Sequence, residues 1–145
     1  MATVSTYIHF AGNTEEAFQF YRSAFGTEFV GPITRFKDLP PPPPGQPPIA
    51  EADMNKIMHI ALPTLGEHVL RGNDAPEWLG KLIKGNNVDL SLHPDTRAEA
   101  DRLFAALSEG GTVETPPQDM FWGDYFGSCI DKFGINWMIN CSQKK

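Results

Sequence analysis

One order of predicted elements, strand, helix and three strands, occurs twice along the chain, and this repeat is what most constrains the fold. The predicted strands cover residues 3–10, 28–36, 57–63 and 68–70, then 88–93, 112–115, 125–130 and 135–141. A single βαβββ unit leaves one face of its sheet uncovered, and pairing two units buries that face. The sequence therefore predicts an α+β fold in which two βαβββ modules form a curved, open, mixed sheet around a cleft.

Both predicted helices carry start and stop signals. Asn13 or Thr14 can cap the first helix, which has acidic residues in its first turn and stops at Gly26. Asp95 or Thr96 can cap the second, which ends before a pair of glycines. In both segments apolar residues recur at the three and four spacing of a buried helix face.

Length and charge limit the organisation and the partners. At 145 residues the chain predicts a single domain, with module one at about 1–73, a linker at about 74–86 and module two at about 87–145. The formal net charge of −6, with lysine and arginine scattered, argues against binding nucleic acid or an anionic membrane. No signal or membrane-spanning segment is recognised, and Cys129 and Cys141 are expected as reduced, packed thiols, so we expect a cytoplasmic protein.

A Pro-rich loop covers residues 40–48. Proline lacks the N–H group that a sheet interior requires, so this segment predicts an exposed, stiff insert within module one. Recruitment of a partner through the same prolines is a further hypothesis.

Three groups of residues carry a family resemblance. They are Tyr7 to Phe10 with the Gly12 to Ala17 segment, then Ile57 to His59, and finally the run from Phe121 to Gly127 ahead of the final hairpin turn. The chain resembles the vicinal oxygen chelate superfamily of glyoxalases, bleomycin resistance proteins and extradiol dioxygenases. Within it the chain is similar to the PhnB-like subgroup, which has the legacy label 3-demethylubiquinone methyltransferase-like. No Gly-rich nucleotide-binding loop supports methyltransferase chemistry.

The resemblance implies a metal centre that draws one His or carboxylate ligand from each of four strands. The matching positions fall near Thr6 or Tyr7, near Leu70 or Arg71, near Asn87 or Asp89, and at Met138. A thioether and a guanidinium are poor ligands for Mg²⁺, Mn²⁺, Ni²⁺ or Zn²⁺. We therefore expect no metal of the usual kind and no cofactor, while a displaced ligand set around His9, His59 and Asp89 stays open as an alternative.

An aromatic and histidine-containing cleft is the predicted binding site. Alternation along the first strand places Tyr7 and His9 in the cleft and the residues between and after them against the first helix. In the final hairpin, Trp122, Tyr125 and Met138 are expected in the cleft, and Phe126 and Trp137 in the core or a dimer contact. The predicted ligand-binding residues are Tyr7, His9, His59, Arg71, Asp89, Trp122, Asp124, Tyr125 and Met138.

The resulting functional hypothesis is a cytoplasmic homodimer, with domain exchange as an option, that binds a small molecule in this cleft without the superfamily's usual metal. The alternative is a metal-dependent enzyme of glyoxalase or dioxygenase type with ligands around His9 and His59. In either case His9 could act as a general base beside Asp89 or Asp124.

Overall fold

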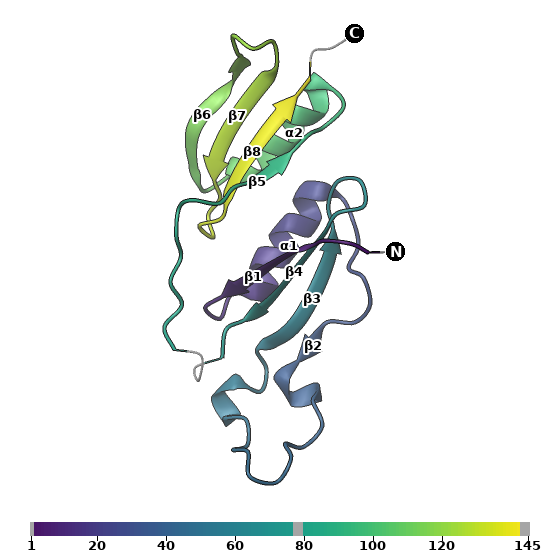
Figure 1. The fold of residues 1–145 in the computed structure, drawn as a ribbon, viewed down its shortest axis with the longest axis vertical. Helices are drawn as coiled ribbons and strands as arrows, with labels where there is room; N and C mark the ends of the chain where they lie inside the picture. Colours follow the sequence, from purple (N-terminus) through teal and green to yellow (C-terminus); the bar gives the residue numbers. More distant parts are fainter. Residues whose placement is uncertain (1, 77–79, 143–145) are drawn as a thin grey trace. The chain divides into compact units, whose positions relative to one another are not determined.

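Two compact units make up the chain in the computed structural model, residues 1–83 and residues 84–145. The structure describes residues 2–76 and 80–142. In each unit one helix packs on one side of a four-stranded mixed sheet (Figure 1).

Unit 1 contains β1 (Thr6–Phe10), α1 (Thr14–Phe25), β2 (Thr34–Arg35), β3 (Ile57–Pro63) and β4 (Val69–Asp74). Its strand order is β1-β4-β3-β2, with β1 parallel to β4 and the other neighbours antiparallel. The apolar side of α1 packs on β3 and β4. Phe18 and Tyr21 of α1 are completely buried, and the Phe18 ring meets Phe10 of β1 edge to face.

Unit 2 repeats this arrangement with β5 (Leu90–Leu92), α2 (Arg97–Ser108), β6 (Thr112–Asp119), β7 (Tyr125–Ile130) and β8 (Asn136–Cys141). Its strand order is β5-β8-β7-β6, again with the first and last strands parallel. The helix α2 packs on β7 and β8, with Leu103 and Leu107 of the helix and Cys129 and Trp137 of the sheet all buried. The shared order confirms the predicted α+β fold built from two βαβββ modules.

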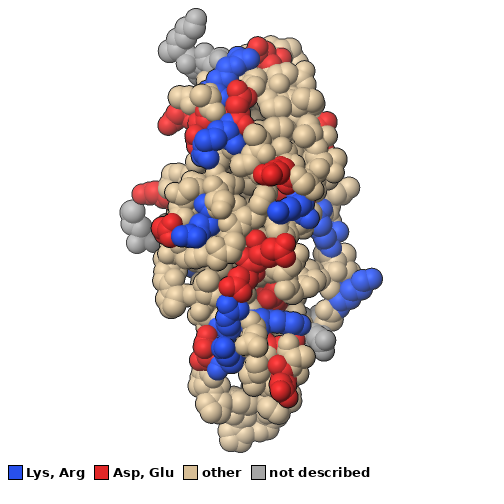
Figure 2. All heavy atoms as spheres, turned by 180° about the vertical axis from the view of Figure 1, so that it is seen from behind, with Lys and Arg blue, Asp and Glu red and all other residues tan. Residues whose placement is uncertain are grey.

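Positive and negative side chains are interspersed over the face of the protein that Figure 2 draws. This distribution accords with the net charge of −6 and with the scattered lysines and arginines in the sequence. In the part of the chain that the structure describes, no helix has the length and apolar character needed to cross a membrane.

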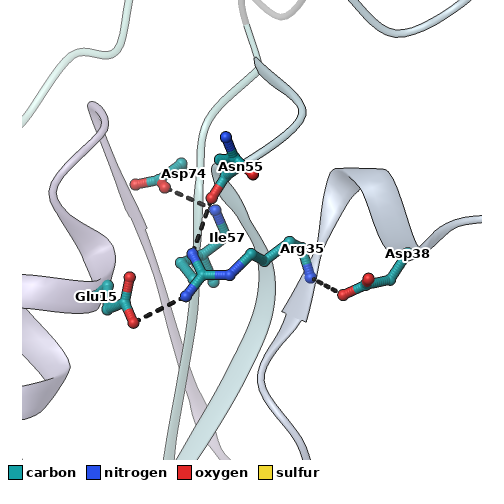
Figure 3. Close-up of polar contacts among 6 residues, drawn as sticks. All are labelled: Glu15, Arg35, Asp38, Asn55, Ile57 and Asp74. Carbon is teal, nitrogen blue, oxygen red and sulfur yellow. Dashed lines mark hydrogen bonds and ion pairs between the residues drawn. The ribbon is translucent and has the colours of Figure 1, made fainter. Parts of the chain in front are cut away.

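The cap of α1 comes from a distant strand. Asn13 occupies the N-cap position but makes no side-chain cap hydrogen bond. Instead, the Asp74 carboxylate accepts hydrogen bonds from the Thr14 backbone N–H at 3.0 Å and the Thr14 hydroxyl at 2.6 Å. Its second oxygen accepts from the Ile57 backbone N–H at 2.8 Å (Figure 3). One buried carboxylate therefore ties the helix start to β3 and β4.

Arg35 of β2 connects β2 with the start of α1 through hydrogen bonds. The Arg35 guanidinium donates to Glu15 on α1 at 2.9 Å and to the Asn55 carbonyl at 2.8 Å, while the Arg35 backbone N–H donates to Asp38 (Figure 3). The hydrogen bond to Glu15 raises the pKa of Arg35 further, although burial opposes this. The contact between Arg35 and Glu15 therefore joins β2 to the first turn of α1.

Five predicted strands have bounds that differ by two or more residues from those in the structure. The strand expected at 3–10 begins at Thr6, and the strand expected at 112–115 continues to Asp119. The strand expected at 28–36 is reduced to β2, because Gly31 has a φ of 70° and Pro32 offers no N–H. The strand expected at 68–70 continues to Asp74, pairing in parallel with β1. The strand expected at 88–93 begins only at Leu90.

The two cysteines are free and buried, as expected. In the β7–β8 register, Cys129 lies opposite Trp137 and Cys141 lies opposite Tyr125, so the thiols do not face each other. Burial raises the pKa of Cys129 to about 12. This thiol is a packing residue and not a nucleophile.

Candidate functional site

Polar and aromatic side chains gather on the side of the unit 1 sheet that faces away from α1. In the β1–β4 register Tyr7 lies beside Arg71, and His9 beside Asn73. Gly72, between Arg71 and Asn73 on β4, has its Cα hydrogen position directed toward α1. A Cβ added there would lie 2.8 Å from the Phe18 ring. We call the group Tyr7, His9, His59, Arg71 and Asn73 the first open face.

Direct contacts link the members of the first open face. The Tyr7 ring centroid lies 5.2 Å from that of His9 and 6.1 Å from that of His59. His9 Nδ1 donates to Asn73 Oδ1 at 2.6 Å. Arg71 Nη1 approaches His59 Nε2 at 3.4 Å, and because a guanidinium can only donate, this nitrogen of His59 is the acceptor.

The electrostatics of the first open face favour a neutral His59 ring and a neutral Tyr7 hydroxyl beside the Arg71 cation. Burial and then the nearby Arg71 charge lower the pKa of His59 below its ordinary value of 6.5. Burial raises the pKa of Tyr7, and Arg71 opposes this. His59 and Tyr7 are therefore both uncharged at neutral pH, while Arg71 carries a full positive charge.

In unit 2, a second group lies on the side of the sheet away from α2. The Trp122 ring meets Phe126 at 5.9 Å between centroids, and Asn140 donates to Asp124 at 2.9 Å. Met138 lies on the same side and is partly exposed. We call the group Trp122, Asp124, Phe126, Met138 and Asn140 the second open face.

Tyr125 lies on the opposite side of the sheet from the one predicted. Tyr125 is buried toward α2, where its hydroxyl donates to Asp101 at 2.5 Å and Arg97 stacks over its ring at 4.0 Å. Phe126, expected in the core or a dimer contact, belongs to the second open face. Side chains alternate along a strand, so a shift of one residue exchanges the two. The cleft position predicted for Tyr125 is therefore wrong, whereas the core position of Trp137 is confirmed.

Asp89 is not on a strand. It is exposed in the segment before β5, and Ser91, opposite Met138, is the β5 residue on the side away from α2. Trp122, Asp124 and Met138 do lie on the second open face, and Tyr7, His9, His59 and Arg71 lie together on the first.

The strand faces decide which positions correspond to the superfamily's metal ligands. In unit 1 these are Tyr7 and Arg71, because Thr6 and Leu70 are directed toward α1. In unit 2 the position on β8 is Met138. Within each unit, no three His, Cys, Asp or Glu side chains among the described residues could hold a metal ion. The residues present therefore do not fit the usual metal centre.

Sequence reasoning missed two residues that organise these sheets. Asn73, which lies beyond the strand predicted at 68–70, fixes His9 from the added part of β4. In unit 2 the buried Asp131 accepts from the backbone N–H groups of Phe133 and Ile135 and from Trp137 Nε1. The position of Asp131 at the start of the polar turn between β7 and β8 could have indicated that its carboxylate accepts hydrogen bonds from the turn. Asn73 had none, because asparagine is uncommon in strands.

A cavity of about 980 Å³ lies elsewhere in unit 1, within the bend of the Pro-rich loop. Prolines of the loop and Pro76 make up most of its lining, together with Phe36 and Ile49. None of the nine predicted ligand-binding residues lines it. Asp53, its buried carboxylate, pairs with Lys56 at 2.8 Å. The cavity is apolar and separate in composition from the first open face.

Two βαβββ modules with the same strand order make up the fold. Residues 4–139 match the Glyoxalase/Bleomycin resistance protein/Dioxygenase superfamily. The chain belongs to this superfamily. It is similar to YjdN of Escherichia coli strain K12, with 29% identity over 141 residues that cover 94% of this chain and 93% of YjdN. The predicted superfamily resemblance is confirmed.

Solved structures of this superfamily's fold cover nearly the whole chain. Protein PA1353 from Pseudomonas aeruginosa is 35% identical with a TM-score of 0.84, covering 99% of this chain and 100% of its own. The PhnB protein from Bacillus cereus is 23% identical with a TM-score of 0.74, covering 97% and 100%. This second likeness shows a shared fold.

Proposed function

We propose that this superfamily member binds a small organic molecule on the first open face and does so without the superfamily's usual metal. The observation that carries the proposal is the convergence of Tyr7, His9, His59 and Arg71 on one side of one sheet. Flat rings with a few oriented polar groups are the usual lining of a small-molecule site.

The donor set supports a site without metal. Arg71 stands at one position that would supply a ligand and Met138 at another, and neither side chain suits a hard or borderline divalent cation. The positive charge on the first open face comes from the protein itself, through Arg71.

A screen of small organic molecules by thermal shift in EDTA-containing buffer, followed by calorimetry of the hits, tests this proposal. A true ligand should bind the metal-free protein, and Tyr7→Ala and His9→Ala should each weaken it. His93→Ala is the matched control, because His93 is an exposed histidine of unit 2 that contacts Ser91. Hits that bind all three variants equally would contradict the proposed location.

A metal-dependent enzyme of glyoxalase or dioxygenase type is the second candidate. One observation favours it: His9 and His59 both lie next to Tyr7 on the same side of the sheet, although Asn73 and Arg71 already contact them. Under this alternative, metal would be bound near the two histidines and lost when either is replaced.

We further infer a cytoplasmic homodimer. β1 and β2 are the edge strands of one sheet and β5 and β6 those of the other. Edge strands carry unpaired backbone groups, which favour association with another chain. Light scattering coupled to gel filtration should give twice the 16.1 kDa chain mass. A mass of one chain at micromolar concentration would contradict the dimer, whether or not the modules exchange.

A further inference from the structure

We propose that Arg71 binds an oxyanion, a carboxylate or a phosphoryl group, carried by the small molecule that occupies the first open face. The inference rests on the proposed function, because it names the chemical class of ligand for the same site.

Arg71 differs from every other arginine of the chain in its partners. The chain has five arginines, and four of them form ion pairs with carboxylates at 2.7–2.9 Å. These pairs are Arg22 with Glu28, Arg35 with Glu15, Arg97 with Asp119, and Arg102 with Glu99. Among the residues that the structure describes, no carboxylate pairs with Arg71; its polar contact is the neutral His59.

The position of Arg71 on an inner strand removes part of its charged side chain from water, and no carboxylate among the described residues compensates for this loss of hydration. Arg71 lies on β4, an inner strand between β1 and β3, and its side chain is only partly exposed. The strands of unit 1 contain one acidic residue, Asp74, which is directed toward α1 and accepts from Thr14 and Ile57. A partly desolvated cation without an anion nearby gains most from an anionic ligand.

The neighbours of Arg71 complete an oxyanion site. A guanidinium presents a planar fork of donors that matches a carboxylate or phosphoryl group. The Tyr7 hydroxyl is a further donor on the adjacent strand, and the exposed Tyr7 ring offers an apolar surface for the rest of the ligand. Asn73 and His9 hydrogen-bond each other on the same face, and Arg71 carries a permanent positive charge there.

Matched probes test the inference: benzoate and phenylphosphonate, each compared with neutral benzyl alcohol. Binding is followed by NMR through the ring signals of Tyr7, His9 and His59. In the wild type, at least one anionic probe should bind roughly tenfold more tightly than the alcohol, the difference that one charge-assisted hydrogen bond supplies. The two anions distinguish a carboxylate site from a phosphoryl site.

Variants assign the preference to Arg71. Arg71→Gln should abolish the anionic preference, and Arg71→Lys should retain part of it. Arg102→Gln, on an exposed pair of α2, is the matched control and should behave as wild type. Each variant's folding is checked by its thermal midpoint and by the dispersion of its NMR spectrum.

Each remaining outcome is decisive. Equal binding of anionic and neutral probes, or an anionic preference that survives in a folded Arg71→Gln protein, would overturn the oxyanion inference and leave the binding face in place. If no probe shifted any signal of the first open face, the oxyanion inference would be contradicted, and the screen described above would decide separately on the proposed function.

Discussion

At the scale of single residues, the contact between Arg71 and His59 sets the charge state of the first open face. Arg71 can only donate, so its approach to His59 Nε2 requires the neutral imidazole. Burial and the Arg71 charge both act in this direction. His59 is therefore neutral at neutral pH, next to the positive charge of Arg71.

We predict that His59 titrates below its ordinary pKa of 6.5 and that Arg71→Gln raises this pKa only part of the way back, because burial is the larger cause. The neutral form is favoured by folding, so His59 contributes stability above pH 6.5 that is lost as the pH falls through the folded-state pKa. Titration of the imidazole signals by NMR measures this. A His59 pKa above 6.5, or one unaffected by Arg71→Gln, would contradict the account.

The buried Asp74 carboxylate is the residue on which the start of α1 depends. Replacing it by alanine leaves the Thr14 and Ile57 N–H groups without their acceptor in the interior. An unsatisfied buried donor costs about 1–3 kcal/mol, so we expect Asp74→Ala to lower the free energy of unfolding by roughly 3 kcal/mol or more. Urea unfolding measures this difference.

Asp95→Ala is the control for Asp74→Ala, because Asp95 is an exposed aspartate and should change the unfolding free energy by less than about 0.5 kcal/mol. Equal stability of the two variants would show that the Asp74 cap does not support the fold.

At the scale of elements, β4 and β7 show which features of the fold local sequence predicts and which it does not. The repeat, both helices and the final hairpin were predictable, because apolar periodicity and turn residues specify them locally. The last three residues of β4, Gly72 to Asp74, are poor strand formers, and their strand conformation depends on parallel pairing with β1, a contact distant in sequence.

The sides of the β7 side chains were not predictable in the same way. Tyr125 and Phe126 are both aromatic, and hydrophobicity alone does not say which is directed toward α2. Asp101 and Arg97 on the helix decide this by contacting Tyr125, and helix-to-sheet contacts of this kind are not visible in local sequence. By contrast, His9 alternates with clearly apolar neighbours, so its side was predicted correctly.

Gly72 is the element-scale test of how β4 packs. An alanine Cβ at this position would lie 2.9 Å from the Ile8 carbonyl oxygen and 2.8 Å from the Phe18 ring. Relieving this overlap requires the backbone or α1 to move, so we expect Gly72→Ala to destabilise the protein by about 1–3 kcal/mol. Chemical denaturation checks the value.

Gly85→Ala is the comparison for Gly72→Ala, since its added Cβ would meet only the side chain of Asn87, at 3.3 Å. An unfolding midpoint for Gly72→Ala equal to that of the wild type would contradict the close packing of β4 on α1.

At the scale of the whole molecule, two units of the same topology carry different chemistry. The first open face has histidines, a tyrosine and an arginine without a carboxylate partner among the described residues. The second open face has two aromatic rings, a methionine and an Asp–Asn pair. Both arise on the side of a sheet that its own helix leaves uncovered, so the repeated fold creates the surfaces and the sequence differentiates them.

We infer that the first open face binds its ligand through the protein's own charge and not through a metal. The most direct test is the metal content per chain of untagged protein expressed with Mn, Fe, Co, Ni and Zn available. We predict far less than one metal per chain, with no change in His9→Ala or His59→Ala. Nearly one metal per chain in the wild type, lost in either variant, would contradict the claim and establish the metal-dependent alternative.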